Sequence, residues 1–259
     1  MTERRNMNTQ KRRKCIIAAL EQEGSVKTSE LSEEYQVSVM TIRRDLNYLA
    51  GEGIVTLTHG GAVLNRGSLI EHAMMYKEDT LIDEKRRIGA FCANFVHEGD
   101  VVMIDTGSTA KMVAETMINR KNIVVVTHSL PVQDMLAHAS GIKLIAAPGV
   151  FREKTMGFLG QMTCDFVSSL KLDVLFLGVE GVDVRHGISV PDVIDGETKR
   201  ALVRQARKVV VVADYTKIGK SFFLSIVPVK EMDVLVTNRE ADQDIIGQIR
   251  EAGVEVFLV

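Results

Sequence analysis

From residue 83 to the end of the chain, short runs of Val, Ile and Leu alternate with segments that have helical periodicity. The clearest runs are residues 101–105, 123–127, 143–147, 174–178, 209–213, 234–237 and 254–259. Runs that are apolar at nearly every position predict strands with both faces covered, as in a parallel sheet. Strands that alternate with helices predict a mainly parallel, doubly wound α/β fold.

The first 64 residues have a different pattern, namely three short helices and a small hairpin. Helical spacing covers residues 10–23 and 28–35, and a third helix begins after Ser38, whose hydroxyl can cap it. A β-like pair of segments follows within residues 54–64, around Gly60-Gly61. These patterns predict a winged helix-turn-helix domain at residues 1–64, a linker at 65–80, and an effector-sensing and oligomerisation domain at 81–259.

The third helix has one apolar face and one polar face. Ile42, Leu46 and Leu49 recur at positions i, i+4 and i+7, so they must pack inward. Side chains near the N-terminal end of such a helix reach base edges in the major groove, and its N-terminus attracts phosphate. The candidate DNA-binding residues in this domain are Lys14, Thr28, Ser38, Met40, Thr41, Arg43, Arg44 and Asn47.

A solvated surface is the alternative for several of these charges. Arg43 and Arg44 would then face water, with Asp45 paired to one of them. We favour this pairing for Asp45, because a carboxylate would repel DNA phosphates, and we favour DNA contact for the two arginines. Six of the ten Lys and Arg residues in residues 1–66 lie between Arg4 and Lys14, which predicts a phosphate-contacting arm, a solvated helix face or a disordered tail.

Polar residues follow several of the predicted strands. The segment Asp105-Thr106-Gly107-Ser108-Thr109 ends one strand and begins a helix, so it can offer an anion a tight turn, hydroxyls and N–H groups. Residues 127–128, 178–181 and 214–217 follow other strands and should reach the same edge, where open α/β sheets bind ligands. Ordinary helix capping by Ser108 and Thr109 is the alternative.

These motifs resemble the DeoR family of bacterial sugar-metabolism regulators. In the first domain the resemblance covers Arg12 through Ile16, Leu20, Ser38, Thr41-Ile42-Arg43-Arg44-Asp45-Leu46 and His59-Gly60-Gly61-Ala62. In the second domain it rests on Lys85, the loop 105–109, Thr127, Lys199 and Thr216-Lys217. The resemblance implies a sensor domain similar in fold to ribose 5-phosphate isomerase and CoA-transferases.

The resemblance also implies a repressor that forms a dimer or tetramer, binds a double-stranded DNA operator and responds to a phosphorylated sugar or polyol. The effector-binding residues it implies are Lys85, Asp105, Gly107, Ser108, Thr109, Thr127, Lys199 and Lys217, and His128 is added as a candidate because it follows the strand 123–127 at the same edge. The chain departs from the family at Leu57, usually Arg, at Pro148-Gly149, usually Gly-Gly, and at His128, often Asn. His128 is expected either to contact the effector or to lie in a solvent-facing loop.

The sequence indicates no metal, cofactor or membrane partner. Cys15, Cys92 and Cys164 are far apart and match no metal-ligand spacing, which predicts buried, reduced thiols in a cytoplasmic protein. The longest apolar runs have strand length, and no apolar stretch of signal-peptide type follows the basic N-terminus.

Two functions compete with that of an effector-controlled regulator. A sugar-phosphate isomerase would use Glu180 and Asp183 for proton transfer, but the fused DNA-binding domain favours sensing over catalysis. The second alternative is a constitutive DNA-binding protein whose C-terminal domain only oligomerises. The loop 105–109 and the matching lysines argue against it. The prediction is therefore a regulator and not an enzyme.

Overall fold

The computed structural model describes residues 9–51, 54–65 and 81–259, without the side chains of six residues in the first helix. The chain divides into two compact units, Met1–Tyr76 and Lys77–Val259. The predicted linker, residues 65–80, lies outside the described residues apart from Asn65. The same holds for residues 1–8, the first part of the basic N-terminal segment.

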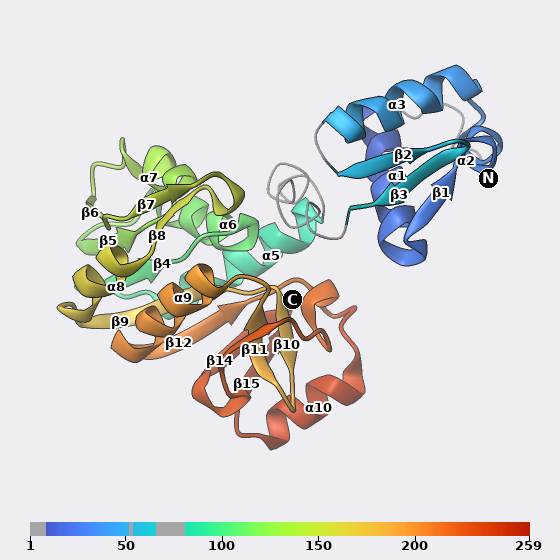
Figure 1. The fold of residues 1–259 in the computed structure, drawn as a ribbon. Coiled ribbons are helices and arrows are strands. Elements are labelled where there is room, and N and C mark those ends of the chain that lie inside the picture. The colour runs from blue at the N-terminus through green and yellow to red at the C-terminus, as the bar shows by residue number, and fades with distance from the viewer. Residues whose placement is uncertain (1–8, 52–53, 66–80) are drawn as a thin grey trace. The chain divides into compact units, whose positions relative to one another are not determined.

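The first unit is a winged helix-turn-helix, as predicted (Figure 1). Its side chains pack into one core because the apolar positions of each helix recur at helical spacing. The largest buried members of that core are Ile16, Leu20, Ile42, Leu46, Leu49 and Ile54. Its elements are α1 (Thr9–Glu23), β1 (Ser25–Lys27), α2 (Thr28–Tyr35), α3 (Val39–Gly51), β2 (Val55–Thr58) and β3 (Gly61–Leu64).

Strand β1 is absent from the sequence-based prediction. It has three residues, of which only Val26 is buried, so it has no recognisable alternation. It completes an antiparallel sheet with the order β1-β3-β2. Gly61 permits this pairing, because a Cβ at that position would lie 1.9 Å from the carbonyl oxygen of Val26.

The second unit is built on a seven-stranded sheet that is parallel throughout, with the order β15-β14-β12-β9-β4-β5-β6 (Figure 1). The predicted doubly wound fold is confirmed. The strands are β4 (Val101–Ile104), β5 (Ile123–Thr127), β6 (Ile142–Ala146), β9 (Leu172–Gly178), β12 (Ala206–Val212), β14 (Val234–Thr237) and β15 (Glu255–Leu258).

Helices cover both faces of this sheet, which explains why its strands are apolar on both sides. Two separate clusters of buried side chains mark the two faces. The first face packs against α5 (Ile82–Cys92), α6 (Ser108–Met117) and α7 (Leu130–Leu136). The second face packs against α8 (Gln161–Ser168), α9 (Val193–Gln205) and α10 (Gln243–Glu251).

The strand order reverses direction between β4 and β9. The chain runs from β4 outward through β5 and β6, then crosses back and enters β9 on the other side of β4. In open α/β sheets such a switch point opens a crevice at the carboxyl ends of the two strands, where ligands bind. Asp105 directly follows β4, and Gly178 ends β9.

Five short strands of the second unit were missed by the sequence analysis. A hairpin, β7 (Val150–Arg152) and β8 (Gly157–Leu159), lies between β6 and α8. A small antiparallel sheet contains β10 (Gly181–Asp183), β11 (Gly187–Val190) and β13 (Leu224–Val227). Strands of three or four residues are too short to show the two-residue period on which prediction depends.

Candidate DNA-binding and effector sites

Helix α3 presents the predicted DNA-binding face to solvent. Met40 is 63% exposed, and Arg43, Arg44 and Asn47 are also exposed. Ser38 caps the helix as predicted, because its hydroxyl oxygen accepts a hydrogen bond from the N–H of Thr41 at 3.1 Å. This part of the site is therefore open for contact with base edges.

The remaining candidates lie in different surroundings. Thr41 is half-buried, and its hydroxyl lies 2.9 Å from that of Ser38. Thr28 is buried at the start of α2, and its N–H donates to the carbonyl oxygen of Gly60 at 2.8 Å. That bond ties α2 to the turn between β2 and β3. The side chain of Lys14 lies outside the described residues.

Asp45 does not pair with Arg43 or Arg44, so that expectation is wrong. Its carboxylate is buried and accepts from Nε of Arg12 at 2.6 Å and from Nε of Arg13 at 2.9 Å. Burial of Asp45 agrees with the expectation that it does not contact DNA, but its partners lie on α1. Arg12 and Arg13 therefore hold α1 against α3, which leaves fewer basic residues of the N-terminal segment for phosphate contact.

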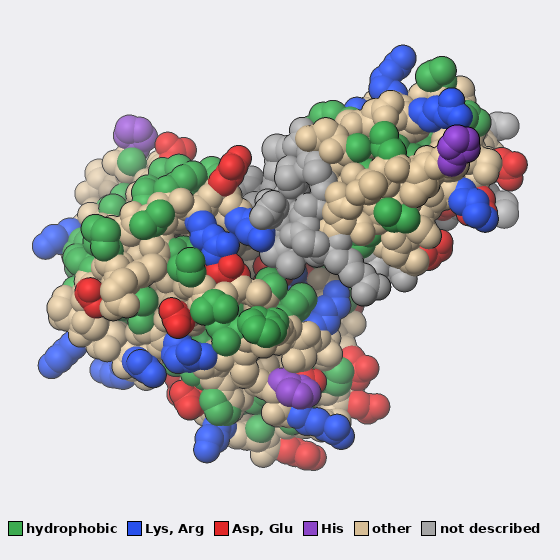
Figure 2. Space-filling view, in the orientation of Figure 1, with side chains coloured by type: hydrophobic (Ala, Val, Ile, Leu, Met, Phe, Trp, Pro, Cys, Tyr) green, Lys and Arg blue, Asp and Glu red, His purple; other side chains and the backbone are tan. Residues whose placement is uncertain are grey.

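A groove runs between α3 and the hairpin formed by β2 and β3. Its lining includes Arg43 and Asn47 on one side and Leu57, Thr58 and His59 on the other. Leu57 is 45% exposed and faces this groove, so its side chain is not buried inside the hairpin. Figure 2 shows Lys, Arg and His side chains spread over the same unit.

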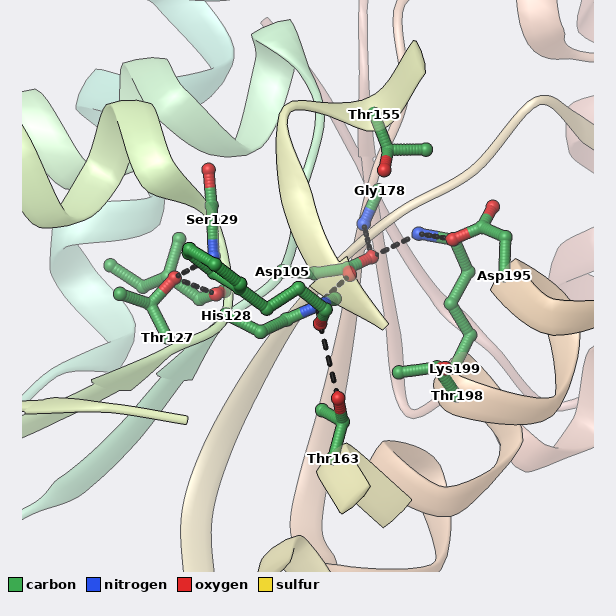
Figure 3. Close-up of polar contacts among 12 residues, drawn as sticks. Asp105, Thr127, His128, Ser129, Thr155, Thr163, Gly178, Asp195, Thr198 and Lys199 are labelled. Carbon is green, nitrogen blue, oxygen red and sulfur yellow. Dashed lines mark hydrogen bonds and ion pairs between the residues drawn. The ribbon is translucent and has the colours of Figure 1, made fainter. Parts of the chain in front are cut away.

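The second site is centred on Asp105, at the switch point of the sheet (Figure 3). Its carboxylate is fully buried and accepts from Nε2 of His128 at 2.8 Å, from Nζ of Lys199 at 2.5 Å and from the N–H of Gly178 at 3.0 Å. Burial alone would raise the pKa of Asp105, but Lys199 and His128 lower it to about 2. Asp105 thus joins the ends of β4, β5 and β9 to α9.

Lys199 has a second acidic neighbour, which the sequence analysis did not select. The Oδ1 atom of Asp195, one helical turn earlier on α9, lies 3.5 Å from Nζ of Lys199 and accepts no hydrogen bond from the described residues. Burial raises the pKa of Asp195, and Lys199 partly offsets that rise. Burial would lower the pKa of Lys199, but Asp105 and Asp195 hold it above its usual value. Asp195 and Lys199 stand four residues apart on one helix, and this i, i+4 spacing could have indicated their contact from the sequence alone.

The loop after Asp105 has the features of an anion site. Gly107 has φ of 113° and is the N-cap of α6, with no side-chain cap bond. The capping role considered for Ser108 and Thr109 is therefore not observed. Both residues are more than nine-tenths buried. N–H groups that no side chain caps, with hydroxyls beside them at a helix N-terminus, suit phosphate.

Other predicted effector residues have structural partners. The hydroxyl of Thr127 donates to the carbonyl oxygen of Ile104 at 2.7 Å, which ties β5 to β4. Lys217 forms an ion pair with Glu180 at 2.9 Å. Lys85 is buried in the first turn of α5. The structure therefore brings His128 and Lys199 each into contact with Asp105, whereas Lys217 pairs with Glu180 and Lys85 lies on α5.

His128 is fully buried, so the expectation of a solvent-facing loop is wrong. Its burial follows from the hairpin β7–β8, which the sequence analysis missed. The N–H of Phe158 donates to the carbonyl oxygen of His128 at 2.8 Å, and Nδ1 of His128 lies 2.9 Å from the carbonyl oxygen of Phe158. The hairpin therefore covers the residue that follows β5.

The two carboxylates considered for isomerase chemistry are both engaged. Glu180 is paired with Lys217, and Asp183 accepts from the N–H groups of Arg185 and His186 at 2.9 and 2.8 Å. These bonds close the turn between β10 and β11. They give the two carboxylates structural roles in the small antiparallel sheet and at its edge.

The remaining expectations concern thiols, metals and membranes. Cys92 is buried as predicted, and burial raises the pKa of its thiol. Cys15 and Cys164 are half-buried, so the predicted burial is wrong for these two. Across the described ranges, no three His, Cys, Asp or Glu side chains are grouped to hold a metal ion. No helix in those ranges has the length and apolar character needed to cross a membrane.

Solved structures with partial likeness to the chain include an isomerase and a regulator. Ribose 5-phosphate isomerase A from Methanocaldococcus jannaschii is 19% identical, with a TM-score of 0.40 over 54% of this chain and 55% of that one. The full-length sorbitol operon regulator SorC from Klebsiella pneumoniae is 16% identical, with a TM-score of 0.39 over 91% of this chain and 98% of that one.

Sequence comparisons give a closer relationship. The glycerol-3-phosphate regulon repressor of Escherichia coli (strain K12) is 33% identical over 90% of this chain and 92% of its own length. The HTH-type transcriptional repressor GlcR of Bacillus subtilis (strain 168) is 29% identical over 97% of each. A DeoR-like helix-turn-helix domain matches residues 12–67, and a DeoR C terminal sensor domain matches residues 80–239. The chain therefore belongs to the DeoR family.

Proposed function

We propose that this protein is a transcriptional repressor that binds operator DNA through α3 and releases it when a phosphorylated sugar or polyol binds at the loop 105–109. Its relatives are repressors, and the exposed face of α3 supports the same role here. We assign DNA binding to residues 1–64, the linker to 65–80, and effector sensing to 81–259. Such a repressor works in the cytoplasm.

The observation that carries the effector proposal is the start of α6. Gly107 opens the helix, and the hydroxyls of Ser108 and Thr109 lie beside N–H groups that no side chain caps. A phosphate carries close to two negative charges at neutral pH and has three acceptor oxygens for such donors. Asp105 is fully engaged with its neighbours, so in this proposal it braces the loop and does not contact the effector.

We expect Thr109→Ala to fold, to bind operator like the wild type, and to need at least tenfold more effector for release, because it lacks one phosphate donor. The measurement is an operator-binding titration with the DNA duplex that the full chain enriches from a random library. The effector panel contains glycerol 3-phosphate and the phosphates of common pentoses and hexoses.

Thr116→Ala is the matched control for this prediction. Thr116 also lies on α6, but its hydroxyl donates to the carbonyl oxygen of Val113 at 2.8 Å, near the other end of the helix. It should respond to effector like the wild type. If effector releases operator from Thr109→Ala as it does from the wild type, the phosphate does not bind at this loop. If no compound of the panel releases operator from the wild type, the alternative of a constitutive DNA-binding protein is favoured.

We also propose self-association through an apolar surface of the second unit. Its members are Val150 and Phe151 on β7, Met162 on α8, Val193 and Ile194 on α9, and the adjoining Phe222 and Phe223, of which Phe223 is 82% exposed. The segments that carry them adjoin one another: Arg152 of β7 pairs with Asp192, Cys164 of α8 contacts Glu197, and Leu224, next to Phe223, lies against Gly196 of α9. Hydrophobic side chains gather on this face in Figure 2.

A second copy of the chain is the partner that this surface suits. Helix-turn-helix proteins read two half-sites with two recognition helices, and each chain supplies one. Seven large apolar side chains provide several hundred Å² of exposed area, which approaches the roughly 800 Å² per partner of a stable interface. Homo-oligomers with a shared apolar interface are common among soluble proteins.

The double substitution Met162→Ser with Phe223→Ser should therefore lower the oligomeric state, because it removes two of the most exposed apolar side chains from this surface. Sedimentation velocity of the full chain measures this. Ile118→Ser is the control: Ile118 is the exposed C-cap residue that follows α6, so this variant should leave the oligomer intact. An unchanged oligomer in the double variant would place the interface elsewhere.

A further inference from the structure

The imidazole of His128 faces a hydrogen-bond acceptor on each side. Its Nε2 atom lies 2.8 Å from a carboxylate oxygen of Asp105, and its Nδ1 atom lies 2.9 Å from the carbonyl oxygen of Phe158. A carbonyl oxygen can only accept, and an ionised carboxylate can only accept. A neutral imidazole has one N–H, so it would leave a nitrogen lone pair directed at an oxygen lone pair. Both contacts are satisfied only when both ring nitrogens carry a proton.

The charges around the ring are arranged to support an imidazolium. Asp105, from the end of β4, contacts both His128 and Lys199, and its lowered pKa of about 2 keeps it ionised. Asp195, also on α9, adds an acidic group 3.5 Å from the ammonium of Lys199. The two buried cations therefore share the ionised carboxylate of Asp105, and a buried charge requires such a partner.

Thr163, on α8, is the other donor to the carbonyl oxygen of Phe158. Its hydroxyl oxygen lies 3.1 Å from that oxygen and 2.7 Å from the carbonyl oxygen of Pro148 (Figure 3). A hydroxyl has one hydrogen for these two acceptors. The shorter contact is the one to Pro148, so His128 is the main donor to Phe158.

The bond from His128 to Phe158 connects the hairpin β7–β8 to the loop 105–109. The N–H of Leu130 donates to the carbonyl oxygen of Met156, which extends the contact between the hairpin and the segment after β5. Gly157 lies directly against the loop, because a Cβ there would come within 2.4 Å of Cγ2 of Thr106. The hairpin thus forms one wall beside the start of α6.

We propose that His128 is a positioning residue held as an imidazolium, and that its second proton fixes the β7–β8 hairpin against the effector loop. The consequence for sensing rests on the function proposed above. When one proton is removed, His128 keeps one partner and repels the other, so either the hairpin or Asp105 moves away from the loop. Effector affinity should then fall although no residue in contact with phosphate has changed.

The charge of His128 can be measured without any effector. In the full chain labelled with ¹⁵N-histidine, both ring nitrogens of His128 should give the signals of a protonated imidazolium at pH 7.5, assigned by comparison with His128→Asn. Amide hydrogen exchange at Phe158, corrected for intrinsic pH dependence, should quicken when those signals become those of the neutral ring. A neutral ring at pH 7.5 would overturn the proposal.

The second measurement is effector release between pH 7 and 9, with the panel compound that releases operator best. The phosphate is already largely a dianion in this range, so its own titration contributes little. The wild type should lose about tenfold in effector affinity. His128→Asn should be about tenfold weaker at pH 7 and nearly independent of pH, because one amide group offers donors to only one of the two acceptors.

Thr163→Val is the matched control, since it removes the uncharged donor to the same carbonyl oxygen. It should keep the pH dependence of the wild type, and loss of that dependence in Thr163→Val would contradict the role of His128. Wild-type effector affinity that does not change with pH would overturn the proposal as well. The two proposals can fail separately. If the His128 ring is protonated but no panel compound releases the protein from operator, the proposed effector is refuted and the assignment of the His128 charge is supported.

Discussion

Lys199→Met should lower the free energy of unfolding of the second unit by about 3–5 kcal/mol, the usual cost of removing one partner from a buried ion pair. Methionine has a similar length but leaves the carboxylates of Asp105 and Asp195 without their ammonium group. The measurement is urea unfolding of the full chain, followed by hydrogen exchange in peptides from β4 and β9. This separates the second unit from the first, because a chain of two units need not unfold in one step.

Lys230→Met is the control for this prediction, because Lys230 is exposed and its loss should change stability by less than about 0.5 kcal/mol. The pH dependence gives an independent check. The pKa of Asp105 is about 2 in the folded protein, below its ordinary value of 3.8, so its stabilising effect is present above pH 4 and is lost as the pH falls toward 2. In Lys199→Met this acid-induced loss should shrink. A variant as stable as the wild type would show that Lys199 contributes nothing net to the second unit.

Arg43→Ala and Arg44→Ala should each weaken operator binding by roughly tenfold to a hundredfold, since a base-edge arginine provides about 1–3 kcal/mol of discrimination. Both side chains are exposed, so neither substitution should change the stability of the first unit. The measurement is fluorescence anisotropy with the selected duplex and with a scrambled duplex at the same salt concentration.

Arg43→Lys and Arg44→Lys distinguish base contact from phosphate contact. Lysine keeps the charge but loses the planar fork that pairs with guanine. If an arginine contacts a base edge, its lysine variant should bind operator nearly as weakly as its alanine variant. If it contacts a phosphate, the lysine variant should keep most of the wild-type operator affinity. Full operator affinity in both alanine variants would remove the two arginines from the interface and leave them as a solvated surface.

The sequence by itself determined the elements whose cause is local. The strands β4, β5 and β9 are apolar at nearly every position, and this pattern alone placed them in a covered parallel sheet. Ser38 was identified as a cap because the bond to the N–H of Thr41 spans three residues. The loop 105–109 was found because a polar segment with a glycine directly followed an apolar run.

Only the tertiary structure decided which distant groups meet. Asp45 pairs with Arg12, 33 residues away, and Asp105 pairs with Lys199, 94 residues away. Asp45 has Arg43 and Arg44 beside it in the sequence, and Asp105 has Lys111 six residues later, so no local rule points to the distant partners. The choice for Asp105 follows from the crossover that inserts β9 beside β4, because that step brings Gly178 and α9 to the carboxyl end of β4. Burial of His128 is also decided by tertiary structure, because it depends on the hairpin β7–β8. The strands of this hairpin have three residues each, so their pairing is stabilised by contacts with the rest of the unit and not by their own sequence pattern.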